Sequence, residues 1–351
     1  MTGAERMLAA ARCEPTDRTP VWYMRQAGRS LAGYRALRAE NDILVMQRDP
    51  ETAAKITLMP VERLGVDAAV VYADIMLPLD IMGLDFWIEP ETGPMLDEPV
   101  RTAEDIAKLR VADAADHTQY VFDAIELVRR ELDGKHAVVG FAGSPFTLAC
   151  YMIEGRPTRE YGKAKSLMFG QSDLWHELVG KITDVTVDYL AGQVAAGAQV
   201  IQLFDSWVGT LSPQAYQEFV KPYSTRIFDA LREQGVPSVH FGTGCAHLLE
   251  DMAGAGPDVV SVDWRLPLDD AWARIGDLAI QGNLDPTVVL TDWSTVERHA
   301  GDVLDRAGGR PGHIFNLGHG VLPDTDPTVL ADLRGFVHDR SAAPSSKRGS
   351  R

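Results

Sequence analysis

The sequence contains 351 residues, of which 45% are hydrophobic and 24% are charged, a composition that is ordinary for a globular protein. Its formal net charge of −16 gives no bulk attraction for nucleic acid or for anionic membranes, so we expect neither as a partner. If the protein binds an anionic small molecule, a local cluster of cationic side chains must hold it.

Several features favour a reducing compartment. The cysteines, Cys13, Cys150 and Cys245, are few, odd in number and far apart, which argues against a disulfide framework. Charged residues interrupt the first apolar run, unlike the core of a signal peptide. No stretch approaches the roughly 20 apolar residues that span a bilayer. We therefore expect a cytoplasmic protein.

Short apolar runs rich in β-branched residues and bounded by Gly, Pro or Asp indicate strands. Eight such runs occur, at residues 21–24, 68–72, 137–141, 199–204, 238–241, 259–262, 278–281 and 313–317. Some are almost continuously apolar, as strands buried on both faces are. Most of these runs are separated by longer stretches, and this predicts parallel pairing.

Three of the intervening stretches have clear helical patterns. The first is 49–64, with Pro50 as a start signal; the second is 174–196; the third is 213–234, with a break near Pro222. The alternation predicts an α/β fold, a single-domain (β/α)8 barrel over residues 1–340, with an open doubly wound sheet as the alternative. The remaining tail, 341–351, has no apolar anchor, and we expect it to be disordered.

Polar residues follow the ends of the predicted strands. They are Arg25 and Arg29, Asp74, Ser144, Asp205 with Ser206, Thr243, Asp263, Asn283 with Asp285, and His319. In a barrel all these positions share one rim, where barrel enzymes hold their active sites. Because loops are polar in most proteins, the pattern predicts where a site lies and not what it does.

The most specific feature is residues 20–38, PVWYMRQAGRSLAGYRALR. This segment contains four arginines and no acidic residue: Arg25, Arg29, Arg35 and Arg38. A guanidinium matches a carboxylate in a bidentate manner. One interpretation is a solvated helix face, with the last two arginines paired to Glu40 or Asp42. For Arg25 and Arg29 we favour a polyanion site, since both follow a strand and Ala27 and Gly28 leave room for a ligand.

The same segment resembles the first signature of the uroporphyrinogen decarboxylase family, a tryptophan-containing strand followed by MRQAGR and a YR pair. The run GFAGSPFTLACYMIEG at 140–155 resembles the second signature. The pieces YADI at 72–75, QLFDSW at 202–207 and NLGHG at 316–320 also resemble family segments in the right order. One departure is Ala32-Gly33, where the family usually has Pro-Glu; it puts the shape of the turn after Arg29 in doubt.

The resemblance implies a cytoplasmic, cofactor-free homodimer that converts the acetate arms of uroporphyrinogen III to methyl groups, giving coproporphyrinogen III. It implies that Asp74 accepts hydrogen bonds from the pyrrole N–H groups and stabilises a cationic intermediate. Arg25 would position or protonate the reacting arm, and Tyr151 would lie near it. The full set of substrate-binding residues implied is Arg25, Gln26, Ala27, Gly28, Arg29, Arg38, Asp74, Tyr151, Ser206 and His319.

The individual residues have ordinary interpretations as well. An aspartate after a strand is often a helix N-cap, a buried tyrosine often bonds only to backbone, and a histidine in a glycine-rich loop often has no role.

Two rival functions remain. A zinc-dependent methyltransferase acting on corrinoid proteins would need a His-x-Cys pair, but His240 is followed two residues later by Gly242, and no cysteine lies beyond Cys245. Cys245 and His247 alone are too few ligands, so no metal is expected. A non-catalytic tetrapyrrole carrier would also need arginines, but Asp74 would weaken its binding of an eightfold acid.

Overall fold

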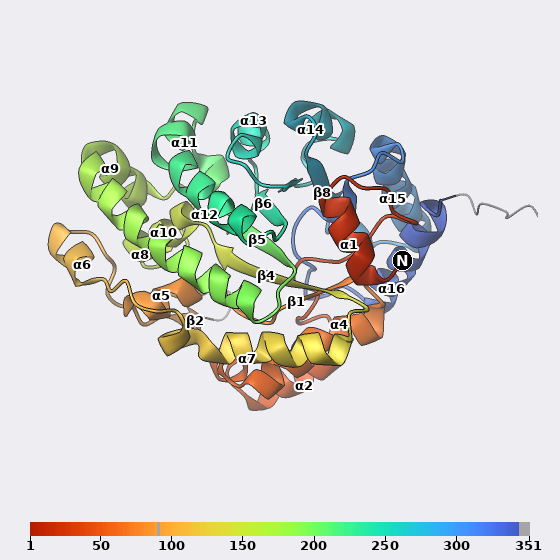
Figure 1. The fold of residues 1–351 in the computed structure, drawn as a ribbon, viewed down its shortest axis with the longest axis horizontal. Helices are drawn as coiled ribbons and strands as arrows, with labels where there is room; N and C mark the ends of the chain where they lie inside the picture. Colours follow the sequence, from red (N-terminus) through yellow and green to blue (C-terminus); the bar gives the residue numbers. More distant parts are fainter. Residues whose placement is uncertain (90–91, 344–351) are drawn as a thin grey trace, which may run out of the picture.

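The computed structural model describes residues 1–89 and 92–343 of the chain (Figure 1). Most of the tail that we expect to be disordered, 344–351, lies outside the described residues. The three residues before it are held in place: Ser341 Oγ donates to the carbonyl of Val337 at 2.6 Å, and the N–H of Ala343 donates to the carbonyl of Asp17 at 2.8 Å.

Seven parallel strands form one curled sheet in the order β1-β4-β5-β6-β7-β8-β9. They are β1 Ala68–Val70, β4 Ala137–Gly143, β5 Val200–Asp205, β6 Ser238–Gly242, β7 Val259–Ser261, β8 Ala279–Leu284 and β9 His313–Leu317. Each lies within or overlaps one of the segments predicted from the sequence, so those seven predictions are confirmed. A separate antiparallel pair, β2 Trp87–Glu89 and β3 Gly93–Met95, was not predicted.

The helices lie outside the sheet (Figure 1). They are α1 Gly3–Ala11, α2 Ala32–Glu40, α3 Ile43–Arg48, α4 Pro50–Leu64, α5 Leu77–Met82, α6 Ala103–Lys108, α7 Ala115–Leu132, α8 Pro145–Glu154, α9 Gly162–Gly170, α10 Ser172–Ala195, α11 Pro213–Phe219, α12 Lys221–Glu233, α13 Leu249–Ala253, α14 Leu268–Ile275, α15 Trp293–Ala307 and α16 Pro327–Arg340. Helices α4 and α10 confirm two predicted helices. The third is divided at Val220 into α11 and α12, close to the predicted break.

The predicted first strand, 21–24, needs correction. Val21 makes a single parallel bridge to Phe315 in β9, and no ladder continues from it. The N–H of Met24 instead donates to the side-chain oxygen Oδ1 of Asn316 at 3.0 Å. The N–H of Trp22 donates to the carbonyl of Phe315 at 3.4 Å, so the segment lies alongside β9 without forming a named strand of the sheet. The described sheet has seven strands, curled into a half-barrel, and a closed barrel of eight strands is not shown.

The interior of the curled sheet contains a buried polar layer. Trp22 Nε1 donates to Gln281 Oε1 at 2.9 Å, and Gln281 Nε2 donates both to Gln202 Oε1 at 3.0 Å and to Ser261 Oγ at 2.9 Å. All four side chains are buried. Buried amide groups are stable only when they are hydrogen-bonded. The hydrogen bonds of this layer hold the indole ring of Trp22 in place.

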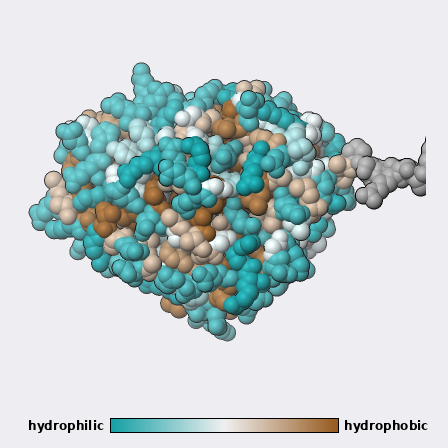
Figure 2. All heavy atoms as spheres, viewed as in Figure 1, coloured by the Kyte–Doolittle hydropathy of each residue, from teal (hydrophilic) through white to brown (hydrophobic). Residues whose placement is uncertain are grey.

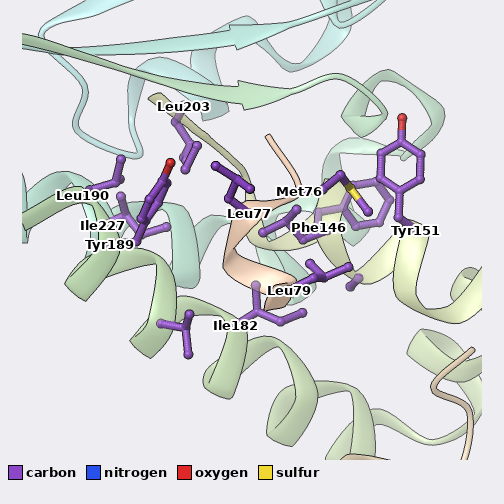
Figure 3. Close-up of a cluster of buried hydrophobic side chains, with 14 of the residues drawn as sticks. Met76, Leu77, Leu79, Phe146, Tyr151, Ile182, Tyr189, Leu190, Leu203 and Ile227 are labelled. Carbon is purple, nitrogen blue, oxygen red and sulfur yellow. The ribbon is translucent and has the colours of Figure 1, made fainter. Parts of the chain in front are cut away.

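A larger apolar core lies between the sheet and the helices on its outer face. Figure 3 shows part of it, where Met76, Leu77 and Leu79 contribute side chains beside Phe146 and Ile182. These residues come from α5 with the residue before it, from α8 and from α10. Their packing fixes the first turn of α8 against α5, which starts just after Asp74.

The outer surface in Figure 2 is mostly hydrophilic, with smaller apolar areas between the polar side chains. Among the described residues, no helix has both the length and the apolar character needed to cross a bilayer.

Candidate active site

A cavity of about 430 Å³ opens at the carboxyl ends of the strands. Eight of the ten predicted site residues line it: Arg25, Ala27, Gly28, Arg29, Asp74, Tyr151, Ser206 and His319. They come from segments that are far apart in the sequence, and the parallel sheet brings them to one rim. Part of the rim predicted from the strand ends forms this cavity: Arg25, Arg29, Asp74, Ser206 and His319 line it, whereas Ser144, Asp205, Thr243, Asp263, Asn283 and Asp285 do not.

The two cavity arginines have no acidic partner. Arg25 and Arg29 are exposed at the cavity, and neither takes part in an ion pair with any described acidic residue. Arg25 has a left-handed backbone, with φ of 58°. Its side chain crosses Gly320, where an added Cβ would lie 2.4 Å from Arg25 Cδ. Glycine at 320 therefore lets the guanidinium of Arg25 reach the cavity beside His319.

Asp74 follows β1 and lines the same cavity. Its Oδ1 accepts a hydrogen bond from the N–H of Met76 at 2.9 Å, so it stabilises the turn that leads into α5. Burial raises the pKa of Asp74, while that hydrogen bond and the charge of Arg25 oppose the rise. One carboxyl oxygen of Asp74 therefore stabilises a turn before α5, whose N-cap residue is Met76, and the residue lines the cavity.

Tyr151 lies on α8, and its ring packs edge-on against Trp207 with centroids 6.0 Å apart. Figure 3 shows its hydroxyl pointing away from the other labelled side chains of the core. Burial, with a contribution from the charge of Asp74, raises the pKa of Tyr151 well above its ordinary value. The hydroxyl therefore stays protonated at neutral pH and can donate a hydrogen bond.

His319 lies in the loop after β9, with its ring 6.1 Å from that of Phe241. Burial and the nearby charges of Arg25 and Arg265 lower its pKa to about 4. The imidazole is thus neutral at neutral pH and can both donate and accept a hydrogen bond. A neutral ring of this kind suits a hydrogen bond to a carboxylate better than an ion pair.

Ser206 directly follows Asp205, a fully buried carboxylate at the end of β5. Asp205 Oδ1 accepts hydrogen bonds from Ser144 Oγ and from Thr147 Oγ1, the latter at 3.1 Å. Ser144 caps the N-terminus of α8, the helix that carries Tyr151. This carboxylate therefore ties the start of the Tyr151 helix to the strand that ends at Ser206.

Two predicted residues do not line the cavity. Gln26 is fully buried beneath it, where Nε2 donates to the carbonyl of Ala68 at 2.9 Å. Arg38 lies on α2, and its Nη1 donates to the carbonyl of Asn41 at 2.7 Å. The structure thus separates these two side chains from the other eight.

The turn after Arg29 is built without the family's usual Pro-Glu. Helix α2 begins at Ala32, and both Ala32 and Gly33 are exposed. Arg35 Nη1 reaches back and donates to the carbonyls of Arg29 and Ser30, each at 2.9 Å. These two bonds hold the turn that carries Arg29. Arg29 is therefore held at the cavity although Ala32-Gly33 replaces the family's usual Pro-Glu.

The cavity has walls that sequence reasoning missed. Tyr34 and Tyr72 line it as a hydrogen-bonded pair, with their hydroxyl oxygens 3.2 Å apart. Gln47 of α3 and Ile88 of β2 also contribute. Tyr34 and Tyr72 lie in the YR pair and in YADI, two segments that resemble the family, although no site role was predicted for them. Gln47 and Ile88 lie outside those segments and reach the cavity through the packing of α3 and of the β2–β3 pair.

The residues considered for a zinc site lie elsewhere. His240 is completely buried, with Nε2 3.5 Å from Asp205 Oδ2 and its ring 5.1 Å from that of Phe228. Neither His240 nor Cys245 lines the cavity. Within the part of the chain that the structure describes, no group of three or more His, Cys, Asp or Glu side chains could hold a metal ion.

Comparisons with known proteins agree with this geometry. The family model described as uroporphyrinogen decarboxylase (URO-D) matches residues 2–340. A uroporphyrinogen decarboxylase of Carboxydothermus hydrogenoformans is 47% identical over 339 residues, which cover 96% of this chain and 97% of the relative. One of Sorangium cellulosum is 49% identical over 335 residues, covering 95% and 96%.

A solved structure has the same fold. The methyltransferase from Methanosarcina mazei superposes with a TM-score of 0.82 at 20% sequence identity, covering 97% of this chain and 99% of that protein. At this identity the likeness concerns the fold alone.

Proposed function

This chain belongs to the uroporphyrinogen decarboxylase family, and from that premise we propose how the residues of its cavity perform the reaction. The protein is a carboxy-lyase of porphyrin biosynthesis, and its substrate is a tetrapyrrole. The product is the tetrapyrrole in which acetate arms have become methyl groups. The observation that carries the proposal is the placement of two unpaired arginines and one buried carboxyl group around a single cavity.

The arginines bind the acidic periphery of the substrate. Arg25 and Arg29 present guanidinium groups that form no ion pair with the acidic residues of the described ranges, and a guanidinium pairs with a carboxylate in bidentate geometry. Ala27 and Gly28 allow the ligand to approach the backbone between them. Ser206 and the neutral ring of His319 supply hydrogen bonds to further carboxylates. Gln26 and Arg38 belong to the proposed set by family resemblance, without a place on the cavity wall.

The chemistry needs an electron sink, and the pyrrole ring can provide it. Protonation of the ring carbon next to the one that bears the acetate arm gives a cation whose charge is shared by the carbon bearing the arm. The bond between the arm and its carboxyl group then breaks, CO2 leaves, and the electron pair forms an exocyclic double bond that neutralises the ring. A second proton converts this methylene group to a methyl group, and loss of the first proton from the ring carbon restores the pyrrole. No external electron acceptor is consumed, so the proposal includes no cofactor.

Asp74 stabilises the cation. Its carboxylate accepts hydrogen bonds from the pyrrole N–H groups and lies close to the positive charge as it forms. A fixed charge in a site with little water stabilises a transition state by several kcal/mol. Burial makes the charge of Asp74 costly in the free enzyme, and a developing cation offsets that cost. Tyr151 donates a hydrogen bond near the reacting arm, and Arg25 positions that arm.

An anaerobic incubation with uroporphyrinogen III tests the function. Counting the carboxyl groups of the product should show loss of four, as coproporphyrinogen III forms. A non-catalytic carrier would return the octa-acid unchanged, and that result would refute the proposal.

The assembly and the finer architecture are proposals too. We infer a cytoplasmic homodimer whose cavities face one another, supported by family membership, and sedimentation of the purified protein tests it. We also infer that residues 1–340 form one domain, since the family model spans 2–340. Within it, the segment 21–24 would complete a barrel. The bridge from Val21 to Phe315 and the bond from Asp67 N–H to the Val21 carbonyl, at 2.8 Å, support this.

A further inference from the structure

Gln47 is a polar side chain of the cavity wall that the proposed mechanism does not use. It lies on α3, lines the cavity and is only 4% exposed. Its side-chain oxygen Oε1 is buried and has no hydrogen-bond partner in the part of the chain that the structure describes. A buried amide group without a partner costs free energy, so such groups are rare in native proteins.

The other polar groups of this wall are already satisfied or already assigned. Tyr34 and Tyr72 bond to each other. On the same side of the cavity, Ile43, Ile88 and Pro94 contribute apolar surface. Oε1 itself is inaccessible, so the end of the Gln47 amide that a ligand in the cavity can reach is Nε2, which makes no hydrogen bond with the described residues.

The position of Gln47 is fixed by the next residue. Arg48 Nη2 donates to Asp80 Oδ2 at 3.1 Å, which ties α3 to α5. Helix α5 begins three residues after Asp74, the proposed counter-charge of the reaction. The ion pair therefore connects α3, which carries Gln47, to α5, which begins near Asp74.

We propose that Gln47 binds a carboxylate of the tetrapyrrole through its side-chain amide. This inference rests on the proposed function, since that function supplies a substrate with eight carboxyl groups. Arg25 and Arg29 are the two arginines on the cavity wall, so most of those groups need neutral donors. The Nε2 of Gln47 carries two N–H donors, which suit the oxygens of a carboxylate.

Two substitutions test the contact. Gln47→Met keeps the length of the side chain and removes the hydrogen bond; we expect KM for uroporphyrinogen to rise about 10-fold with kcat changed less than about twofold. Gln47→Glu places a negative charge against the substrate carboxylate, and we expect a larger rise in KM. The matched controls are Gln214→Met and Gln214→Glu, at an exposed glutamine outside the cavity, which should leave KM unchanged.

A binding measurement separates this inference from the proposed function. The fluorescence of oxidised uroporphyrin, an octa-acid that cannot be decarboxylated in the same way, gives Kd without turnover. We expect both Gln47 variants to bind it more weakly than the wild type. If the wild type binds it but decarboxylates nothing, the function fails while this contact survives.

Two outcomes overturn the inference. Unchanged KM and Kd in both variants would mean that Gln47 does not contact the substrate. Tighter binding by Gln47→Glu would mean that the group accepts a hydrogen bond rather than donating one to a carboxylate. Folding does not confuse the result, because replacing an unpaired buried amide by Met should leave the Tm of the free protein equal or higher.

Discussion

Gln26 and Ala68 are joined by a hydrogen bond of 2.9 Å from the side-chain Nε2 to the carbonyl oxygen at the start of β1. The other end of the same amide accepts the N–H of Tyr23 at 3.0 Å. Gln26 therefore uses both ends of its side chain to tie the arginine segment to the edge of the sheet. These two hydrogen bonds give a structural reason for a glutamine at position 26 of the motif, without any contact to the substrate.

Replacing Gln26 by Leu should destabilise the protein while sparing substrate affinity. The change leaves the N–H of Tyr23 and the carbonyl of Ala68 buried without partners, which costs about 2–5 kcal/mol in all. Urea unfolding measures this loss, with the exposed Gln214→Leu as a control expected to change stability by less than about 0.5 kcal/mol. A large rise in KM without loss of stability would instead identify Gln26 as a substrate ligand.

Asp74→Asn should preserve binding and abolish most turnover. The amide has almost the same shape as the carboxyl group but carries no charge to offset the pyrrole cation. We expect kcat to fall at least about 100-fold, equivalent to roughly 3 kcal/mol of transition-state stabilisation, with Kd for uroporphyrin changed less than about threefold. Normal turnover by this variant would exclude the electrostatic role of Asp74.

The value of kcat/KM should fall at low pH, and the pH at which it falls should depend on the charge of Arg25. Burial raises the pKa of Asp74 and Arg25 lowers it, and the reaction needs the ionised carboxylate. Activity therefore falls as the pH falls through the raised pKa. Removing the positive charge in Arg25→Gln raises that pKa further, so this fall should move to higher pH.

The control for this shift is Arg29→Gln, because Arg29 is not among the charges that shift the pKa of Asp74. Titration of the substrate's own carboxyl groups is common to all the variants and cancels in the comparison. An equal shift in both variants would show that the fall reports the substrate or general binding and not Asp74.

Arg29 and Arg38 should differ in their effect on binding. Arg29 lines the cavity, whereas Arg38 donates to the carbonyl of Asn41 at 2.7 Å. Arg29→Ala should raise KM about 10-fold or more by leaving a substrate carboxylate unmatched, and Arg38→Ala should raise it less. Arg12→Ala, at an exposed position outside the cavity, is the control. Equal effects at 29 and 38 would mean that α2 moves toward the substrate on binding.

His313 should make the protein less stable in mild acid. It is buried on β9 and donates one hydrogen bond, from Nε2 to the carbonyl of Gly282 at 2.9 Å. Burial lowers its pKa from 6.5 to about 4. Between these values the unfolded chain binds a proton that the folded chain does not, so the free energy of unfolding decreases as the pH falls from 6.5 toward 4.

His313→Gln removes one titrating group and should flatten this dependence by up to about 1.4 kcal/mol per pH unit. Urea unfolding at several pH values measures the slope, and His299→Gln, at an exposed position, serves as control. His319, whose pKa is also lowered to about 4, should keep part of the slope in place. A variant slope identical to that of the wild type would contradict the assignment.

A site residue could be predicted when its position follows from the local sequence, and not when distant elements alone bring it to the cavity. Asp74, Ser206 and His319 each follow an apolar strand, and the carboxyl ends of parallel strands meet at one rim, so their proximity could be inferred from local patterns. Arg25 and Arg29 stood out because an acidic chain contains few unopposed cations. The roles assigned to these residues came from family resemblance and await the experiments above.

Local sequence patterns predicted the seven strands of the curled sheet and three helical stretches, since apolar runs and glycine or proline boundaries act over a few residues. Tertiary contacts determine that 21–24 makes only a single bridge to β9, since the N–H of Met24 donates to the side chain of Asn316, a residue distant in the chain. They also determine that Gln26 lies beneath the cavity while Gln47 lies in its wall. Two glutamines are alike in sequence, and packing from remote elements alone determines whether each finds a partner.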